Sequence, residues 1–349
     1  MKYIKHLLLL SMLFFLAMPA SAADGGKKGF DVGGLVFGHI KDSYEWHVTD
    51  IGQTKLVIPL PAVVKTHDGV WHVFNGERVY EEQEIEGLHL AKKGLYEGKL
   101  VETVDGTEVR PLDLSITKQV CVLFINCIIV LLCVLLPARW YKKRKASDAA
   151  PKGFTGFMEM FIMYVVDDMI KPSVGKGYEK YVPYLLTVFF FIFTCNIMGV
   201  IPFPPGGGNV TGNIAITFFL AVMTFLITQF SGTKHYWKEI FWPDVPMWLK
   251  PIMAFIEFFG IFTKPFALMV RLFANMLAGH AIILSLMCII FIMAPLGAVL
   301  CGSMTVLSIA FGIFMDTLEV LICFIQAMVF TMLSATFIGL ARVKPAEAE

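Results

Sequence analysis

The chain has 349 residues, of which 56% are hydrophobic and only 16% charged, and its mean hydropathy is +0.68. This composition excludes an ordinary soluble globular protein and is typical of a protein that crosses a membrane several times. A formal net charge of +1 gives no electrostatic reason to expect a nucleic-acid partner.

The N-terminus has the pattern of a signal peptide. Lys2 and Lys5 form a positive start, residues 7–18 form a short apolar core, and Ala-Ser-Ala at 20–22 resembles a cleavage site. The alternative, a first membrane helix, requires a longer apolar run than this one. We therefore predict a signal peptide at residues 1–22 that exports the segment after it.

Residues 23–115 form the predicted exported domain. The stretch TKLVIPLPAVVKTHDGVWHVFNG alternates β-branched and polar residues between proline and Asp-Gly, which is typical of short strands and turns. All seven cysteines lie in later apolar stretches, so we expect a small β-rich domain without disulfides. His67, His72 and His89 lack the spacing of metal ligands and are interpreted as surface residues.

The first membrane helix is predicted at residues 116–137. The basic run ARWYKKRK follows it directly, and the positive-inside rule places this flank in the cytoplasm. Residues 138–180 are therefore predicted to be cytoplasmic. They comprise a basic linker and an amphipathic helix, at 153–170, that lies in the membrane interface.

A hairpin of two spans is predicted at residues 181–230, and two long helices at residues 251–340. The connectors FPPGGGNVTGN and MAPLGA carry no charge, whereas the loop 231–250 and the tail 341–349 carry lysine or arginine. These alternating loops predict five crossings, with the N-terminal domain exported and the C-terminus in the cytoplasm.

The apolar segment 251–293 is longer than one upright span. As a helix it would measure roughly 64 Å at 1.5 Å per residue, against a hydrocarbon core about 30 Å thick. The last apolar segment has the same excess. We therefore expect an all-α polytopic membrane protein whose last two helices are strongly tilted or extend partly into the cytoplasm, together with the small exported domain.

Polar residues interrupt the apolar segments in stripes. At 100° per residue, one face of the first long helix carries, within about 40°, Glu257, Lys264, Arg271 and Asn275. His280 projects from roughly the opposite side. A face of the last helix, about 60° wide, carries Thr305, Ser308, Gly312, Glu319 and Gln326. The span before them carries Asn213, Thr217, Thr224 and Thr228 on one face.

Each stripe also has an ordinary structural interpretation. Threonine in a membrane helix often bonds its own backbone, Glu257 and Lys264 can anchor a helix at the interface, and Arg271 and Glu319 can form a salt bridge. A charge at bilayer depth costs about 2.5 to 3.5 kcal/mol, however, so ionisable residues there are functional candidates by default. Arginine stays protonated and cannot relay protons, whereas glutamate and histidine can. A fixed cation with such a relay indicates proton movement, and a partner subunit can supply the carboxylate for Arg271.

Three stretches resemble a known family. They are similar to segments of subunit a of F-type ATP synthase and read KPFALMVRLFANMLAGH at 264–280, LEVLICFIQAMVFTML at 318–333 and CNIMGVIPFPPGGGNVTGNIAITFFLA at 195–221. The resemblance covers about residues 116–340, and the arginine motif is its most specific part. It implies that Arg271 faces the carboxylates of a rotating c-ring and that Glu257 belongs to a cytoplasmic half-channel. It implies an entry half-channel lined by His280, Glu319, Asn275 and Gln326.

The resemblance implies a non-catalytic stator subunit that moves protons in the bacterial inner membrane. The implied partners are the c-ring, the subunit b peripheral stalk, the rest of the ATP synthase and membrane lipid, and no cofactor or metal is expected. The chain departs from the family pattern at residues 23–115, which are longer than in many members, and at Gly199, where some members carry an acid. The alternatives are a self-contained secondary transporter, although no internal repeat is visible, and a haem protein, although only one histidine lies at membrane depth.

Overall fold

The structure is a computed structural model that describes residues 42–51, 54–81, 84–91, 96–104, 106–142, 150–201, 207–243 and 245–342. The predicted signal peptide, the first part of the predicted exported segment and the basic residues 143–145 lie outside these ranges. The chain divides into two units, Met1–Cys121 with Gly279–Leu318 and Val122–Ala278 with Glu319–Glu349.

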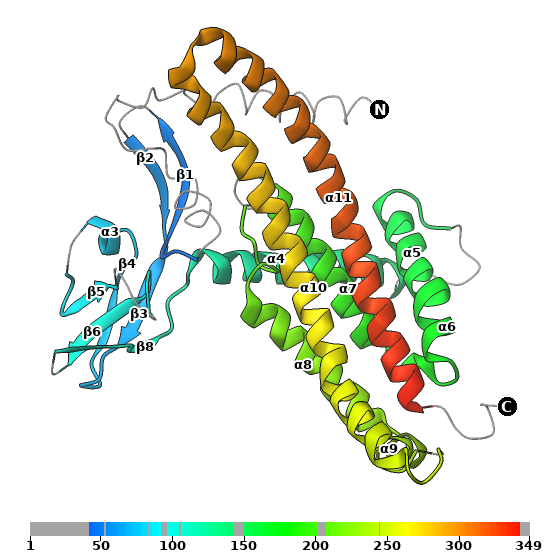
Figure 1. The fold of residues 1–349 in the computed structure, drawn as a ribbon. Coiled ribbons are helices and arrows are strands. Elements are labelled where there is room, and N and C mark those ends of the chain that lie inside the picture. The colour runs from blue at the N-terminus through cyan, green and yellow to red at the C-terminus, as the bar shows by residue number, and fades with distance from the viewer. Residues whose placement is uncertain are drawn as a thin grey trace. The chain divides into compact units, whose positions relative to one another are not determined.

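Short antiparallel strands form the N-terminal part of the first unit (Figure 1). Strands β1 (Glu45–Ile51) and β2 (Thr54–Pro59) pair as a hairpin. Two three-stranded sheets follow, ordered β4-β3-β8 and β5-β6-β7. Their elements are β3 (Pro61–Lys65), β4 (Trp71–Asn75), α3 (Arg78–Glu81), β5 (Leu88–Leu90), β6 (Leu100–Val104), β7 (Thr107–Val109) and β8 (Leu112–Asp113). The predicted β-rich domain is confirmed.

Tyr44 joins three segments of this domain through one buried hydroxyl group. The hydroxyl donates to Asp113 Oδ2 at 2.6 Å and accepts the backbone N–H of Leu100 at 3.2 Å. The ring packs in a core with alternate residues of the sheet, including Ala62 and Val64 from β3. Period-2 burial therefore explains why the apolar stretch forms strands, and the hydroxyl explains how the sheets are held together.

Among the residues that the structure describes, five helices are long and apolar enough to cross a membrane. They are α4 (Lys118–Lys142), α7 (Val182–Val200), α8 (Ile214–Ser231), α10 (Lys250–Met293) and α11 (Ala298–Arg342). The predicted number of membrane-length apolar helices and the great length of the last two helices are confirmed. The first helix continues past the expected end at residue 137, because its internal proline does not end it and the basic, aromatic flank continues the helix to Lys142.

Between α4 and α7, the predicted amphipathic helix at 153–170 is broken into parts. Helix α5 (Phe154–Tyr164) runs into a π-helical turn (Val165–Ile170) and the short helix α6 (Lys171–Val174). Val165, Met169 and Ile170 are buried in the turn. The wider turn places these three apolar residues against the core, while Asp167 remains outside and pairs with Lys171 at 3.8 Å. Short helices η2 (Tyr178–Lys180) and α9 (Lys234–Phe241) flank the α7–α8 hairpin.

The second unit has an aromatic and aliphatic core around α7. Phe161 of α5 contacts Phe189 of α7 and Phe324 of α11, with ring centroids 5.5 and 6.0 Å apart. Leu272 of α10 and Phe330 of α11 belong to the same core. Within this unit α10 and α11 therefore pack as neighbours, which sets the rotation of both helices about their axes.

Candidate functional site

The predicted polar stripe of α10 lies on the surface of the chain. All four of its members are exposed: Glu257, Lys264, Arg271 and Asn275. The face beside this stripe, roughly 60–140° around the helix from Arg271, is buried through Leu268, Leu272 and Met276. Apolar packing on one side therefore fixes the helix so that its charged stripe faces outward, toward lipid or toward another protein.

Arg271 lies near the midpoint of α10 and forms no ion pair with the residues that the structure describes. The structure thus does not contain the Arg271–Glu319 salt bridge that the sequence left open. An exposed guanidinium in the middle of an apolar helix is costly in lipid alone. Such a group requires an acidic or hydrated partner that the described residues do not supply.

A hydrogen bond connects the exposed stripe with the buried face of α11. The side-chain amide of Asn275 donates to Gln326 Oε1 at 2.8 Å. Gln326 is only 2% exposed, so its amide is deep inside the helix pair. Because Asn275 lies one helical turn after Arg271, this contact leads from the arginine surface into the interior of the unit.

Glu319 shares the interior face of α11 with Gln326. The two residues are seven positions apart, which is about 20° around a helix, and Glu319 is only 4% exposed. A carboxyl group is rarely buried in a membrane helix without a role in ion movement. His280 is half-buried on the part of α10 that belongs to the first unit.

The structure also shows polar residues that the sequence analysis missed. Asp316 is half-buried on α11, three residues before Glu319, and its charge within an apolar run was the available signal. Asn126 of α4 is fully buried and donates to Cys195 Sγ at 3.4 Å, and Asn196 accepts from Thr211 at 2.7 Å. A single asparagine in an apolar run gives no periodic pattern, so neither asparagine could be singled out.

The threonines of α8 follow the structural interpretation. The hydroxyl of Thr217 donates to Ile214 O at 3.1 Å, that of Thr224 to Leu220 O at 3.1 Å, and that of Thr228 to Thr224 O at 2.8 Å. Each hydroxyl therefore bonds the backbone of its own helix, and the Thr224 hydroxyl in addition contacts the Tyr184 hydroxyl of α7 at 2.8 Å.

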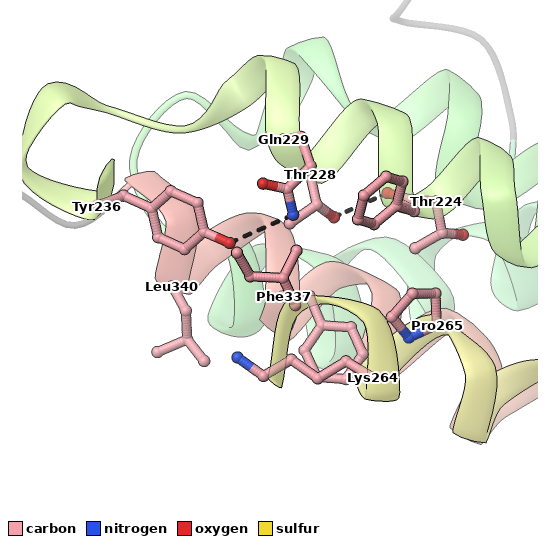
Figure 2. Close-up of a pocket in the computed structure, with 10 residues that line it drawn as sticks. Thr224, Thr228, Gln229, Tyr236, Lys264, Pro265, Phe337 and Leu340 are labelled. Atoms are coloured by element: carbon pink, nitrogen blue, oxygen red, sulfur yellow. Dashed lines mark hydrogen bonds between the residues drawn. The ribbon is translucent and has the colours of Figure 1, made fainter. Parts of the chain in front are cut away.

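A small pocket, lined mostly by apolar surface with a few polar groups, lies beside Lys264, where α8, α9, α10 and α11 meet. It encloses a cavity of about 30 Å³, which is enough for one or two water molecules. Figure 2 shows Gln229 and Tyr236 meeting at its wall, where the Gln229 amide donates to the Tyr236 hydroxyl at 3.3 Å. The carbonyl oxygen of the same side-chain amide, Gln229 Oε1, is buried and has no protein partner among the described residues.

Titratable groups surround this pocket. Burial raises the pKa of Tyr236, the hydrogen bond from Gln229 opposes that change, and the charge of Glu257 raises the pKa further. Glu257 is thus within electrostatic range of Tyr236. The Lys264 ammonium lies 6.0 Å from the centre of the Phe337 ring. The N-terminal half of the α10 stripe is therefore next to a pocket that can hold water.

Comparison with known proteins identifies the family. A family model described as ATP synthase A chain matches residues 120–339, which is more than half of the chain. The chain belongs to the ATP synthase subunit a family.

Individual relatives agree with this assignment to the subunit a family. The chain is 46% identical over 243 residues to ATP synthase subunit a 2 of Chlorobaculum tepidum, covering 67% of this chain and 65% of the relative. It is 38% identical over 280 residues to ATP synthase subunit a of Chloroherpeton thalassium, covering 78% and 76%. For subunit a of Myxococcus xanthus the identity is 39% over 247 residues, covering 69% and 77%.

The N-terminal domain has a separate match. Residues 35–115 fit a family model described as a domain of unknown function. The two matches do not overlap, and the boundary between them lies at the start of α4. The chain therefore joins the helical body of subunit a, a membrane protein, to a β-rich domain with its own family.

Proposed function

We propose that this chain is the stator subunit of a bacterial F-type ATP synthase that carries protons to and from the c-ring. The observation that carries this proposal is the position of Arg271, which is exposed at the midpoint of α10 and forms no ion pair with the described residues. A rotor carboxylate is the partner that would complete this site. The chain itself makes no ATP.

Arg271 would act as a fixed positive charge. In a low-dielectric surrounding, a guanidinium a few ångströms from a carboxyl group stabilises the ionised carboxylate and so drives release of its proton. Because arginine itself does not give up a proton, it also blocks proton hopping along the stripe. One residue would then both unload an arriving rotor carboxylate and keep the two proton paths apart.

Protons would enter from the exported side and leave on the cytoplasmic side. The entry half-channel is proposed to use four residues, of which the Asn275–Gln326 hydrogen bond joins two. They are His280, Glu319, Asn275 and Gln326. The exit half-channel is proposed to pass Glu257, whose charge reaches the water-sized pocket between α8, α9, α10 and α11. A proton crosses only by riding the ring, so flow is coupled to rotation.

His280 and Glu319 are proposed to act as one proton relay. Both can change protonation, and they have opposite charge types, so either order of the two along the path can serve. The variant that exchanges them, His280→Glu with Glu319→His, should restore more proton transport than either single substitution. Equal activity of the single and double variants would contradict the relay.

The remaining partners follow from the same proposal. Subunit b of the peripheral stalk and the other ATP synthase subunits would hold the chain still while the ring turns. The N-terminal domain would be exported to the periplasm, and the C-terminus would lie in the cytoplasm. The proposed setting is the bacterial inner membrane, in contact with lipid.

Proton uptake by liposomes tests the proposal. Vesicles would contain the chain with or without a c-ring, and a potassium diffusion potential would drive uptake. Uptake should require both components and should change sharply in Arg271→Ala. Phe266→Leu, at an exposed apolar position of the same helix, is the matched control and should behave as the wild type. Transport by the chain alone would instead indicate a self-contained transporter and would overturn the proposal.

A further inference from the structure

One face of the β4-β3-β8 sheet is apolar and exposed. In the antiparallel register Val63 lies opposite Val73, and Lys65 lies opposite both Trp71 and Leu112. Directly opposed residues point to the same side of a sheet. On this face Trp71 is 51% exposed and Val73 is 71% exposed, whereas the other face is buried in the domain core.

This apolar face continues toward the first membrane helix. Beyond β8 the chain stays paired with β3, because Leu114 N donates to Val63 O at 2.9 Å and Ile116 N donates to Pro61 O at 3.1 Å. Leu112, Leu114 and Ile116 therefore alternate onto one side and are all exposed. The apolar row ends two residues before α4 begins at Lys118.

The junction between sheet and helix is held by hydrogen bonds. Lys118 N donates to Ser43 O at 2.9 Å, and Gln119 N donates to Asp42 Oδ1 at 3.0 Å. Asp42 also pairs with Lys99 of the same domain at 3.7 Å. The first turn of α4 is thus fastened to the β-rich domain, so the domain must stay at the point where the chain enters the membrane.

We infer that the exposed face of the β4-β3-β8 sheet rests on the outer surface of the lipid bilayer. Leu112 lies six residues before α4, which is within about 20 Å at the rise of an extended chain. Tryptophan favours the membrane interface, where its ring is apolar and its N–H finds a polar partner.

The charges on this face favour lipid as the occupant. Its register positions on β3, β4 and β8 hold apolar residues, Asn75 and a single charge, Lys65, and none of these described positions is acidic. The Lys65 ammonium lies 5.6 Å from the centre of the Trp71 ring. A lysine can extend its charged end to lipid phosphate while its stem lies on apolar surface. The inference requires only that α4 crosses the membrane, and it does not depend on the proton path.

Quenching of Trp71 fluorescence by brominated lipids tests this contact. The full-length chain would be reconstituted in vesicles with or without bromine near the top of the acyl chains. The chain has six tryptophans, so the signal of residue 71 is obtained as the difference between wild type and Trp71→Phe. We expect this difference signal to lose most of its intensity in brominated vesicles.

Three variants make the test decisive. Moving the indole to the other sheet, in Trp71→Phe with Thr103→Trp, should give a signal that bromine does not quench, because Thr103 is exposed on the β5-β6-β7 sheet, which is not part of the proposed contact face. Val73→Asp adds a charge at an exposed position and should abolish quenching of Trp71 while circular dichroism stays unchanged. Val73→Ala should retain quenching.

Other occupants would give other results. If the sheet stood upright on the bilayer, a tryptophan at Asn75 would be quenched and Trp71 would not, and the inference would be wrong. If Trp71 were shielded from water but insensitive to brominated lipid, a protein segment or a second copy would cover the face, which would also overturn it. Proton uptake is not the readout, so failure here leaves the proposed function as it was.

Discussion

The contact between Asn275 and Gln326 is the most direct structural link between the arginine stripe and the interior of the helix pair. Each amide has a defined partner at 2.8 Å, and Gln326 is almost completely buried. A buried amide that loses its partner keeps the cost of desolvation without the compensating bond. Loss of this single bond should therefore lower the rate of proton transport, although both side chains are small.

We predict that Gln326→Leu and Asn275→Leu each slow passive proton conduction through the membrane sector by about tenfold, because one such hydrogen bond contributes on the order of 1.4 kcal/mol. The double variant should be no slower than the slower single variant, since both substitutions remove the same bond. Conduction would be measured in membranes stripped of the catalytic sector. Thr217→Val, whose hydroxyl bonds the backbone of its own helix, is the control. Additive losses in the double variant would refute a shared role.

Tyr44 determines how the N-terminal domain responds to alkaline pH. Burial raises the pKa of Tyr44, and its hydrogen bond to Asp113 raises it further. Burial also raises the pKa of Tyr80, whose hydroxyl accepts the N–H of Tyr44 at 3.1 Å. Both groups hold their protons more tightly in the folded state than in the unfolded state. Their contribution to folding is therefore complete below pH 10 and is lost as the pH rises above it.

We expect the domain to become sensitive to protease as the pH rises above about 10, the ordinary tyrosine pKa. Tyr44→Phe should reduce stability at neutral pH by about 1–3 kcal/mol, because the Asp113 carboxylate and the Leu100 N–H lose their partner. The same variant should show a weaker pH dependence. Digestion rates of the full chain at a series of pH values would measure both effects, and an unchanged pH profile in Tyr44→Phe would contradict this assignment.

The sequence predicted part of the site at the level of residues. Helical periodicity identified Arg271 and its stripe because one helix determines its own faces. It could not predict the Asn275–Gln326 bond, since periodicity does not determine how two helices are rotated relative to each other. That rotation depends on how Leu272 and Phe330 pack in the core.

At the scale of elements, α6 and α11 touch through their backbones. A Cβ atom added at Gly339 would clash with the carbonyl oxygen of Ser173, so glycine is required for this approach. The π-helical turn before α6 was not predicted, because its widened spacing resembles an ordinary amphipathic pattern over so few residues. The α8 threonines illustrate the opposite case, in which a polar face visible in the sequence serves local backbone bonding.

We predict that Gly339→Ala lowers the stability of the helical unit by about 1–3 kcal/mol, because a rigid backbone oxygen cannot move aside without separating α6 from α11. Thermal unfolding in detergent would measure the change. Gly302→Ala on the same helix has open space around the added methyl group and should be neutral or slightly stabilising. Equal effects of the two substitutions would show that helix propensity, and not the close approach, controls the result.

At the scale of the whole molecule, the composition and the loop charges gave the membrane class and five helices, and the structure has five helices that could cross a membrane. The N-terminal domain was recognised only as β-rich. Its short strands are held by contacts between distant segments, such as Tyr44 with Asp113, which no local pattern reveals. The sequence therefore predicted an element well where its own periodicity determines the structure. It predicted poorly where contacts between distant segments determine the structure.

The length of α10 has a consequence for its orientation in the membrane. Its 44 residues measure roughly 66 Å, about twice the hydrocarbon thickness. A helix wholly inside the hydrocarbon would be tilted by about 60° from the membrane normal. Such a tilt would hold the outward stripe at a low angle to the membrane plane, so that a rotating ring could pass along it. It would also place Arg271, near the midpoint, at the centre of the bilayer.

We predict that cysteines placed at the two ends of α10 react with membrane-impermeant reagents from opposite sides. In a chain without native cysteines, Ile252→Cys should be labelled from the cytoplasm and Ile292→Cys from the exported side, since both positions are exposed. Phe266→Cys, nearer the middle of the helix, should be protected, because lipid covers it. Labelling of both ends from one side would show that α10 does not cross, and Arg271 could then not separate two half-channels. Rapid labelling at position 266 from the cytoplasm would instead show that the helix begins well outside the membrane, and the excess length would then be explained without a strong tilt.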